Sequence, residues 1–141
     1  MGASQSVRKI NFEDMQGFIV DPHIIIINTL PSTVQDCLII NTLKASDETT
    51  VLNDLLKKNN KRTIVVYGMN ACDDVLVTKF NQLIKLGFTN VYVYPGGLFE
   101  WLLLQDVYGS DSFPTTKKEL DILQFKGDSL SKRLMITNDY P

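Results

Sequence analysis

The sequence has few cysteines and histidines and no long apolar run, and each shortage excludes a class of protein. Its most apolar run, Ile24–Ile27, is far shorter than the roughly 18 to 20 residues that a membrane-spanning helix needs. Cys37 and Cys72 are the only cysteines, and without an apolar leader we expect them to be reduced and the protein to be cytoplasmic. His23 is the only histidine and has no obvious partner, so we predict neither a metal nor a cofactor.

An excess of positive charge is also absent. The chain has 14 Lys and Arg against 16 Asp and Glu, which gives a net charge of −2. A molecule with this balance has no overall positive field to attract nucleic acid, so we predict no nucleic-acid partner. The apolar fraction of 44% and the charged fraction of 21% are typical of a soluble globular protein.

The order of apolar segments indicates one α/β domain. We predict a flexible lead-in at residues 1–9, a folded domain at 10–125 and a C-terminal tail at 126–141. Short strands alternate with helical segments through short loops, which favours a three-layer domain with a central parallel sheet of about five strands and helices on both faces. The predicted strands are Ile10, Ile24–Asn28, Cys37–Ile40, Thr63–Tyr67 and Val91–Tyr94.

In a parallel sheet the functional crevice lies at the carboxyl ends of the strands. The loop that follows Thr63–Tyr67 is therefore the first place to look for a site. It consists of Gly68, Met69, Asn70, Ala71, Cys72, Asp73 and Asp74.

The second half of the chain resembles the rhodanese family. The motif Gly-Gly-x-x-x-Trp stands at Gly96, Gly97 and Trp101, and it is preceded by Leu-Gly-Phe-Thr-Asn-Val from Leu86. The resemblance covers about Ile10 to Leu123 and implies the rhodanese-like fold, which dual-specificity phosphatases share. The first half is a looser match, because Asn-Thr-Leu follows the first central strand where the family usually has Asp-Val-Arg.

Rhodaneses carry a cysteine at the end of the central strand, directly after a tyrosine. Backbone N–H groups of the loop and the following helix stabilise its thiolate or persulfide and hold an anionic substrate. This chain has Gly68 at that position and no Arg or Lys in the loop. Asp73 and Asp74 stand at the helix start, where their carboxylates satisfy the free N–H groups. We therefore predict a binding or scaffolding module without catalytic activity, with an unidentified protein partner.

Cys72 provides the alternative from the enzyme class, a sulfurtransferase that carries a persulfide on this thiol. The helix N-terminus favours its thiolate, but the adjacent Asp73 and Asp74 disfavour it, and Cys72 lies four positions after the usual nucleophile. Phosphatase activity ranks third, because an acidic loop disfavours phosphate. Cys37 lies on an apolar strand and is predicted to be a small buried hydrophobic residue.

The N-terminal residues match the pattern for N-myristoylation, with Gly2 as the acceptor and Ser6 at the hydroxyl position. A single myristoyl chain gives only marginal membrane binding, so a second signal is required. Arg8 and Lys9 are predicted to supply it by attraction to anionic lipid. The expected result is reversible attachment at the cytosolic face of a membrane.

Overall fold

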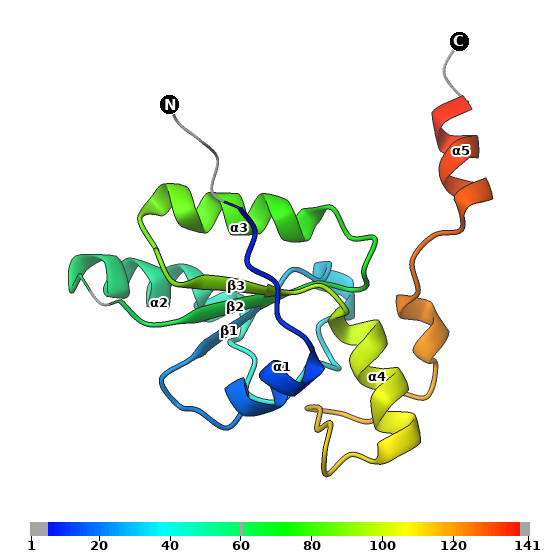
Figure 1. Ribbon diagram of the computed structural model, residues 1–141, viewed down its shortest axis with the longest axis horizontal. Helices are drawn as coiled ribbons and strands as arrows, with labels where there is room; N and C mark the ends of the chain where they lie inside the picture. Colours follow the sequence, from blue (N-terminus) through cyan, green and yellow to red (C-terminus); the bar gives the residue numbers. More distant parts are fainter. Residues whose placement is uncertain (1–5, 60, 139–141) are drawn as a thin grey trace.

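A parallel sheet of three strands forms the centre of the protein (Figure 1). The computed structural model describes residues 6–59 and 61–138. The strands β1 (Ile25–Asn28), β2 (Ile64–Tyr67) and β3 (Val91–Tyr94) lie in the order β1-β2-β3. Ile26 pairs with Val65, which in turn pairs with Tyr92. β2 is thus the central strand, and its carboxyl end lies between the carboxyl ends of its two neighbours.

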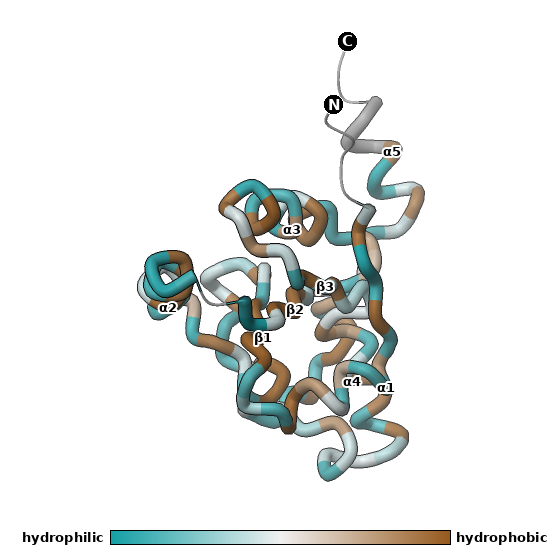
Figure 2. The backbone as a smooth tube through the Cα atoms, turned by 60° about the vertical axis from the view of Figure 1, so that its left-hand side comes forward, coloured by the Kyte–Doolittle hydropathy of each residue, from teal (hydrophilic) through white to brown (hydrophobic). Residues whose placement is uncertain are grey.

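Helices cover both faces of this sheet (Figure 1). Side chains of α2 and α3 pack with one face of the strands, and side chains of α1 and α4 pack with the other. The hydrophobic residues along the strands lie between these helices (Figure 2). The helices are α1 (Phe12–Phe18), α2 (Ala45–Lys57), α3 (Val75–Leu86), α4 (Gly97–Tyr108) and α5 (Leu130–Asn138), with short 3₁₀ turns η1 (Ser32–Val34) and η2 (Ile122–Phe125).

The alternation of side chains along β2 explains how two cores form around one sheet. Ile64 and Val66 point into the core beneath α2 and α3, whereas Val65 and Tyr67 point into the core beneath α1 and α4. Each of these four side chains has an exposed fraction of 0%. The uninterrupted run of apolar residues is therefore the pattern of a strand that is buried on both faces.

The prediction of three layers and a parallel sheet is confirmed, but the expected number of about five strands is wrong. In the described part of the chain the sheet has three strands, and the other two predicted segments form single bridges. Lys9, next to Ile10, forms one bridge with Val93, and Ile39 forms one antiparallel bridge with Thr115. Ile10 and Ile39 contribute apolar side chains to the core, but each of these segments forms one bridge and no longer strand.

The main chain before α1 is attached to the sheet. Val93 N donates to Arg8 O at 2.8 Å, and Ile10 N donates to Val93 O at 2.9 Å. The Arg8 guanidinium lies 4.4 Å from the centre of the Tyr92 ring. The folded part therefore includes Arg8 and Lys9, which the sequence placed in the lead-in, while Gly2 lies outside the described residues. None of the helices within residues 6–59 and 61–138 has the length and apolar character required to cross a bilayer.

Candidate functional site

The loop from Gly68 to Asp74 connects the carboxyl end of β2 to the start of α3. Tyr67, the last residue of β2, is fully buried, and its hydroxyl accepts a hydrogen bond from Ile39 N at 3.1 Å and contacts Thr42 Oγ1 at 2.8 Å. Burial raises the pKa of the Tyr67 phenol well above its ordinary value. A neutral, hydrogen-bonded tyrosine thus fixes the point from which the loop begins.

The Asp73 carboxylate fills the inside of this loop. Its Oδ2 accepts a hydrogen bond from Met69 N at 3.2 Å, and its Oδ1 accepts one from Val75 N at 3.0 Å. Asp74 is the N-cap residue of α3, but its side chain forms no capping hydrogen bond. The Asp73 carboxylate therefore accepts hydrogen bonds from N–H groups on both sides of the turn.

The position of Gly68 is closed to a side chain by the same carboxylate. A Cβ atom added to Gly68 would lie 2.5 Å from Asp73 Oδ2 and 2.9 Å from Thr29 Oγ1. Real Cβ atoms do not approach other heavy atoms this closely, so both side chains would have to move. The place where the family resemblance implies a nucleophile is thus occupied by two oxygen atoms of this chain's own side chains.

The diglycine of the Gly-Gly-x-x-x-Trp motif allows α4 to dock against the loop. Gly97 has φ +68°, and a Cβ there would lie 2.6 Å from Gly68 O. Leu98 N donates to Gly68 O at 2.9 Å, and Phe99 N donates to Met69 O at 2.9 Å. The first turn of α4 therefore uses its free N–H groups to hold the loop, which only a residue without a side chain at position 97 permits.

The tryptophan of the same motif is part of the core. Trp101 has an exposed fraction of 0%, and its Nε1–H donates to Pro114 O at 3.1 Å. Its ring packs edge-on against Phe113, with ring centres 5.0 Å apart. Nearby, Tyr94 donates to Glu100 Oε2 at 2.5 Å, and burial together with Glu100 raises the pKa of the Tyr94 phenol.

A segment close to the C-terminus covers the loop from another side, which the sequence did not indicate. The buried Asn70 donates from Nδ2 to Phe125 O at 2.9 Å, and Phe125 itself is 2% exposed. A Cβ added to Gly127 would lie 3.0 Å from Cys72 Sγ. In the sequence Phe125 is one more apolar residue after Ile122 and Leu123, and a contact so distant in sequence has no local pattern.

The two cysteines lie in different surroundings. Cys72 is exposed, its Sγ lies against Gly127, and its N–H donates to Asn70 Oδ1 at 2.9 Å. Cys37 is 3% exposed, and its thiol donates to Lys117 O at 3.2 Å. Burial raises the pKa of the Cys37 thiol. The prediction that Cys37 is a small buried residue is confirmed, and Cys72 is the accessible thiol.

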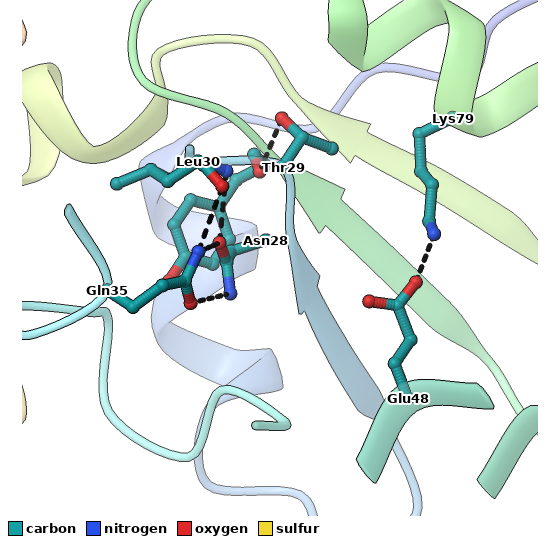
Figure 3. A network of polar contacts seen from close by, with 7 residues as sticks. Asn28, Thr29, Leu30, Gln35, Glu48 and Lys79 are labelled. Atoms are coloured by element: carbon teal, nitrogen blue, oxygen red, sulfur yellow. Dashed lines mark hydrogen bonds and ion pairs between the residues drawn. The ribbon is translucent and has the colours of Figure 1, made fainter. Parts of the chain in front are cut away.

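Neutral amides occupy the end of β1, beside the loop (Figure 3). Asn28 Oδ1 accepts hydrogen bonds from Leu30 N at 3.0 Å and from Gln35 Nε2 at 2.9 Å, and Asn28 Nδ2 donates back to Gln35 Oε1 at 3.2 Å. Gln35 Nε2 also donates to Leu30 O at 2.9 Å. The segment that stands where the family usually has Asp-Val-Arg thus uses its polar groups to hold its own turn.

A lysine of the helix after the loop is already paired, and a cavity of the protein lies away from the loop. Lys79 of α3, close to the loop, forms an ion pair with Glu48 of α2 (Figure 3). A cavity of about 670 Å³ lies between α4 and residues 114–122, and no residue of the loop lines it. Within residues 6–59 and 61–138 no group of three or more His, Cys, Asp or Glu side chains is arranged to hold a metal ion.

A three-layer α/β fold with a strand–loop–helix site at the carboxyl end of its central strand is the architecture of rhodaneses. Residues 38–104 match the family of the Rhodanese-like domain. The chain therefore contains a rhodanese-like domain, as the motifs around Gly97 and Trp101 predicted. A search of curated protein sequences finds no match to the chain.

Solved structures show the same fold at low sequence identity. A protein from Anabaena sp. is 21% identical, with a TM-score of 0.55 over 92% of this chain and 91% of that chain. A single-domain sulfurtransferase from Saccharomyces cerevisiae is 17% identical, with a TM-score of 0.51 over 80% and 100%. The As-Sb reductase from Leishmania major is 19% identical, with a TM-score of 0.56 over 96% and 100%.

Proposed function

We propose that this protein is a catalytically inactive rhodanese-like binding or scaffolding module of the cytoplasm, tethered to a membrane through an acyl chain on Gly2. One observation carries the loss of activity. The Asp73 carboxylate accepts the N–H groups of Met69 and Val75, and its Oδ2 would lie 2.5 Å from a Cβ on Gly68. The same carboxylate thus occupies both the nucleophile's position and the anion cradle.

The chemistry of sulfur transfer explains why this matters. A thiolate attacks the outer sulfur of thiosulfate, a persulfide forms and sulfite leaves, so the site needs a nucleophile and must stabilise negative charge. Gly68 supplies no nucleophile. A fixed carboxylate on the loop N–H groups repels a second anion and leaves it without its donors.

Sulfur transfer by Cys72 is the second candidate, because this thiol is exposed and lies in the loop itself. Its Sγ lies against Gly127, however, while the N–H groups of Met69 and Val75 are directed to Asp73. To use those donors the loop would have to release Asp73 and turn Cys72 inward. We therefore rank this function below the binding module.

An assay of sulfur transfer from thiosulfate to cyanide separates the two candidates. The binding module predicts that the purified full chain gives no thiocyanate above a heat-denatured sample. Cys72→Ser and Cys37→Ser are the matched variants, since each removes one sulfur atom. Turnover that survives Cys37→Ser and disappears in Cys72→Ser would replace the proposal with the persulfide carrier.

Restoring the cysteine tests the role of Asp73 directly. Gly68→Cys alone is expected to stay inactive, because the new Cβ displaces Asp73 and Thr29 and the carboxylate still opposes a thiolate. The double variant Gly68→Cys with Asp73→Ser removes that charge and is the control. Measurable turnover by Gly68→Cys alone, at the same rate as the double variant, would show that Asp73 does not block the site.

The acyl tether is tested by the intact mass of the protein made in a eukaryotic host. The expected result is loss of Met1 and addition of one fourteen-carbon chain, with Gly2→Ala as the unmodified control. Of the predicted second signal, Arg8 is held to the domain, since its Nη2 donates to Thr89 O at 2.9 Å and its guanidinium stacks on Tyr92, whereas Lys9 is exposed. An unmodified Gly2 would end the idea of the tether.

A further inference from the structure

Basic residues gather where the strands of the sheet begin. α2 and α3 both run back from the carboxyl ends of the strands and end at this side of the molecule, next to the segments that lead into β2 and β3 (Figure 1). We call this side the amino-end face. It carries Lys57, Lys58, Lys61, Arg62 and Lys85.

The lysines of this face are available to a partner. Lys57, Lys61 and Lys85 are exposed and form no ion pair among residues 6–59 and 61–138. Lys58 is paired with Asp54 at 3.1 Å, and the Arg62 guanidinium donates to Pro22 O at 2.7 Å. Three cations therefore point into solvent, while the other two hold the local structure.

The face is continuous across the two helix ends. A small cleft of about 70 Å³ is lined by Leu56 and Lys61 from the α2 side and by Gly87 and Thr89 from the α3 side. Leu56 is 37% exposed, and Leu86, the last residue of α3, is 54% exposed. Figure 2 brings this end of the molecule forward. Exposed aliphatic side chains among unpaired lysines are typical of proteins that bind a lipid bilayer, where charged headgroups cover an apolar interior.

The opposite end of the sheet carries the other sign of charge. Asp47 at the start of α2 is exposed, Asp73 and Asp74 lie in the loop before α3, and Glu100 lies in the first turn of α4. Basic residues outnumber Asp21 and Asp54 at the amino-end face, and acidic residues outnumber Lys44 at the opposite end. A net charge of −2 thus hides an opposite balance of charge at the two ends. An anionic surface would bind the amino-end face and repel the opposite end, which fixes one orientation.

Residues 6–8 lie on the side of the amino-end face. Lys9 pairs with Val93 in the parallel direction, so these residues lie toward the amino end of β3. Arg8 Nη2 holds this segment to Thr89 O, which belongs to the lining of the cleft. Gly2 is four positions before Ser6, a span of at most about 14 Å even in a fully extended chain.

We infer that the amino-end face docks on an anionic membrane, with Lys57, Lys61 and Lys85 against the lipid headgroups. This docking rests on the acyl tether of the proposed function and supplies the second signal that a single acyl chain requires. Each lysine near an anionic leaflet increases the partition coefficient about fivefold, so the three together contribute about 100-fold. Binding should weaken as salt rises, because the attraction is screened.

Vesicle sedimentation tests the docking face. The full chain, myristoylated during expression with the transferase, is mixed with vesicles of phosphatidylcholine alone or with phosphatidylserine added. Lys57→Gln, Lys61→Gln and Lys85→Gln together should lower partitioning to the serine-containing vesicles about 100-fold. The matched control is Lys44→Gln, Lys118→Gln and Lys126→Gln, which removes the same charge from exposed sites outside the face and should change it less than about threefold.

The unmodified chain on vesicles of pure phosphatidylserine at low salt separates this inference from the tether. Weak, salt-sensitive binding that the first triple variant abolishes and the control triple retains supports the face even if Gly2 is never acylated in a cell. Equal losses in both triple variants, or binding that does not depend on anionic lipid, would overturn it. Binding to single-stranded RNA without binding to vesicles would also overturn it and assign the face to nucleic acid.

Discussion

The two ends of the sheet differ in how their polar groups are used. At the carboxyl end, Asp73 accepts the loop N–H groups and α4 donates to the loop through Leu98 N and Phe99 N. At the amino end, Lys57, Lys61 and Lys85 are exposed and unpaired within the described ranges 6–59 and 61–138. The polar groups of the loop at the carboxyl end are thus satisfied by the chain itself, whereas three cations at the amino end have no ion-pair partner among the described residues.

The comparison separates the features that belong to the fold from those that belong to the site. The strand–loop–helix geometry is present, and so is the close approach of Gly97 to Gly68 O. In the loop, Gly68 stands where the family resemblance implies a nucleophile, and the Asp73 carboxylate lies against it. Fold comparison detects the first feature and is silent on the second, because function depends on the site rather than on the scaffold.

Replacing two glycines with positive φ, one at each end of the sheet, should give the largest difference in the free energy of unfolding. Gly97→Ala at the carboxyl end should cost about 3 kcal/mol or more, because strain at φ +68° adds to a contact of 2.6 Å with Gly68 O. Gly87→Ala at the amino end, with φ +111° and no atom within 4 Å, should cost only about 1 to 2 kcal/mol. Urea unfolding measures both. Equal costs would mean that α4 does not need its close approach to the loop.

Replacing the adjacent Asp73 and Asp74 one at a time should give a smaller difference in the free energy of unfolding. Asp73→Ala should lower the free energy of unfolding by about 1 kcal/mol, because Met69 N and Val75 N lose their acceptor. Asp74→Ala removes the same charge without removing a capping hydrogen bond and should cost less than about 0.5 kcal/mol. If Asp74→Ala lowered the free energy of unfolding more than Asp73→Ala, then Asp74 and not Asp73 would be the acceptor of the loop N–H groups.

The lysines of the amino-end face should contribute the least to folding. Replacing Lys57, Lys61 and Lys85 with Gln should change the free energy of unfolding by less than about 0.5 kcal/mol per site, since none of them forms an ion pair in the described chain. Thermal unfolding at low and high salt measures this. A large loss would show that these side chains hold the domain together, and the two ends would then not differ as described.

Much of the fold could be predicted from the sequence, because the signals are local. Val91–Tyr94 and the run ending at Tyr67 are strands buried between two helical layers, and their apolar residues follow one another without a break. Ile10 and Cys37–Ile40 have the same composition but form only single bridges nearby. The apolar composition of a segment indicates that it is buried. Whether the segment joins the hydrogen-bonded sheet depends on partners that are distant in the sequence.

The candidate site was only partly predictable for the same reason. The absence of a nucleophile at Gly68 and the presence of acids at the start of α3 can be read directly from the chain. Which acid turns inward cannot, because Asp73 and Asp74 differ only in the direction that the turn gives them. The contact of Asn70 with Phe125 O, and the stacking of Arg8 on Tyr92, arise from tertiary packing and leave no pattern in the sequence.

If the Asp73 carboxylate occupies the anion cradle of the loop, an added anion finds no free N–H group there. Backbone amide chemical shifts of the full chain, followed during a titration with thiosulfate, test it at the atoms concerned. Because both N–H groups donate to Asp73, the signals of Met69 and Val75 should not move beyond the change caused by an equal concentration of chloride. Saturable shifts of these two signals with thiosulfate, absent with chloride, would contradict it and show that the loop still binds an anionic substrate.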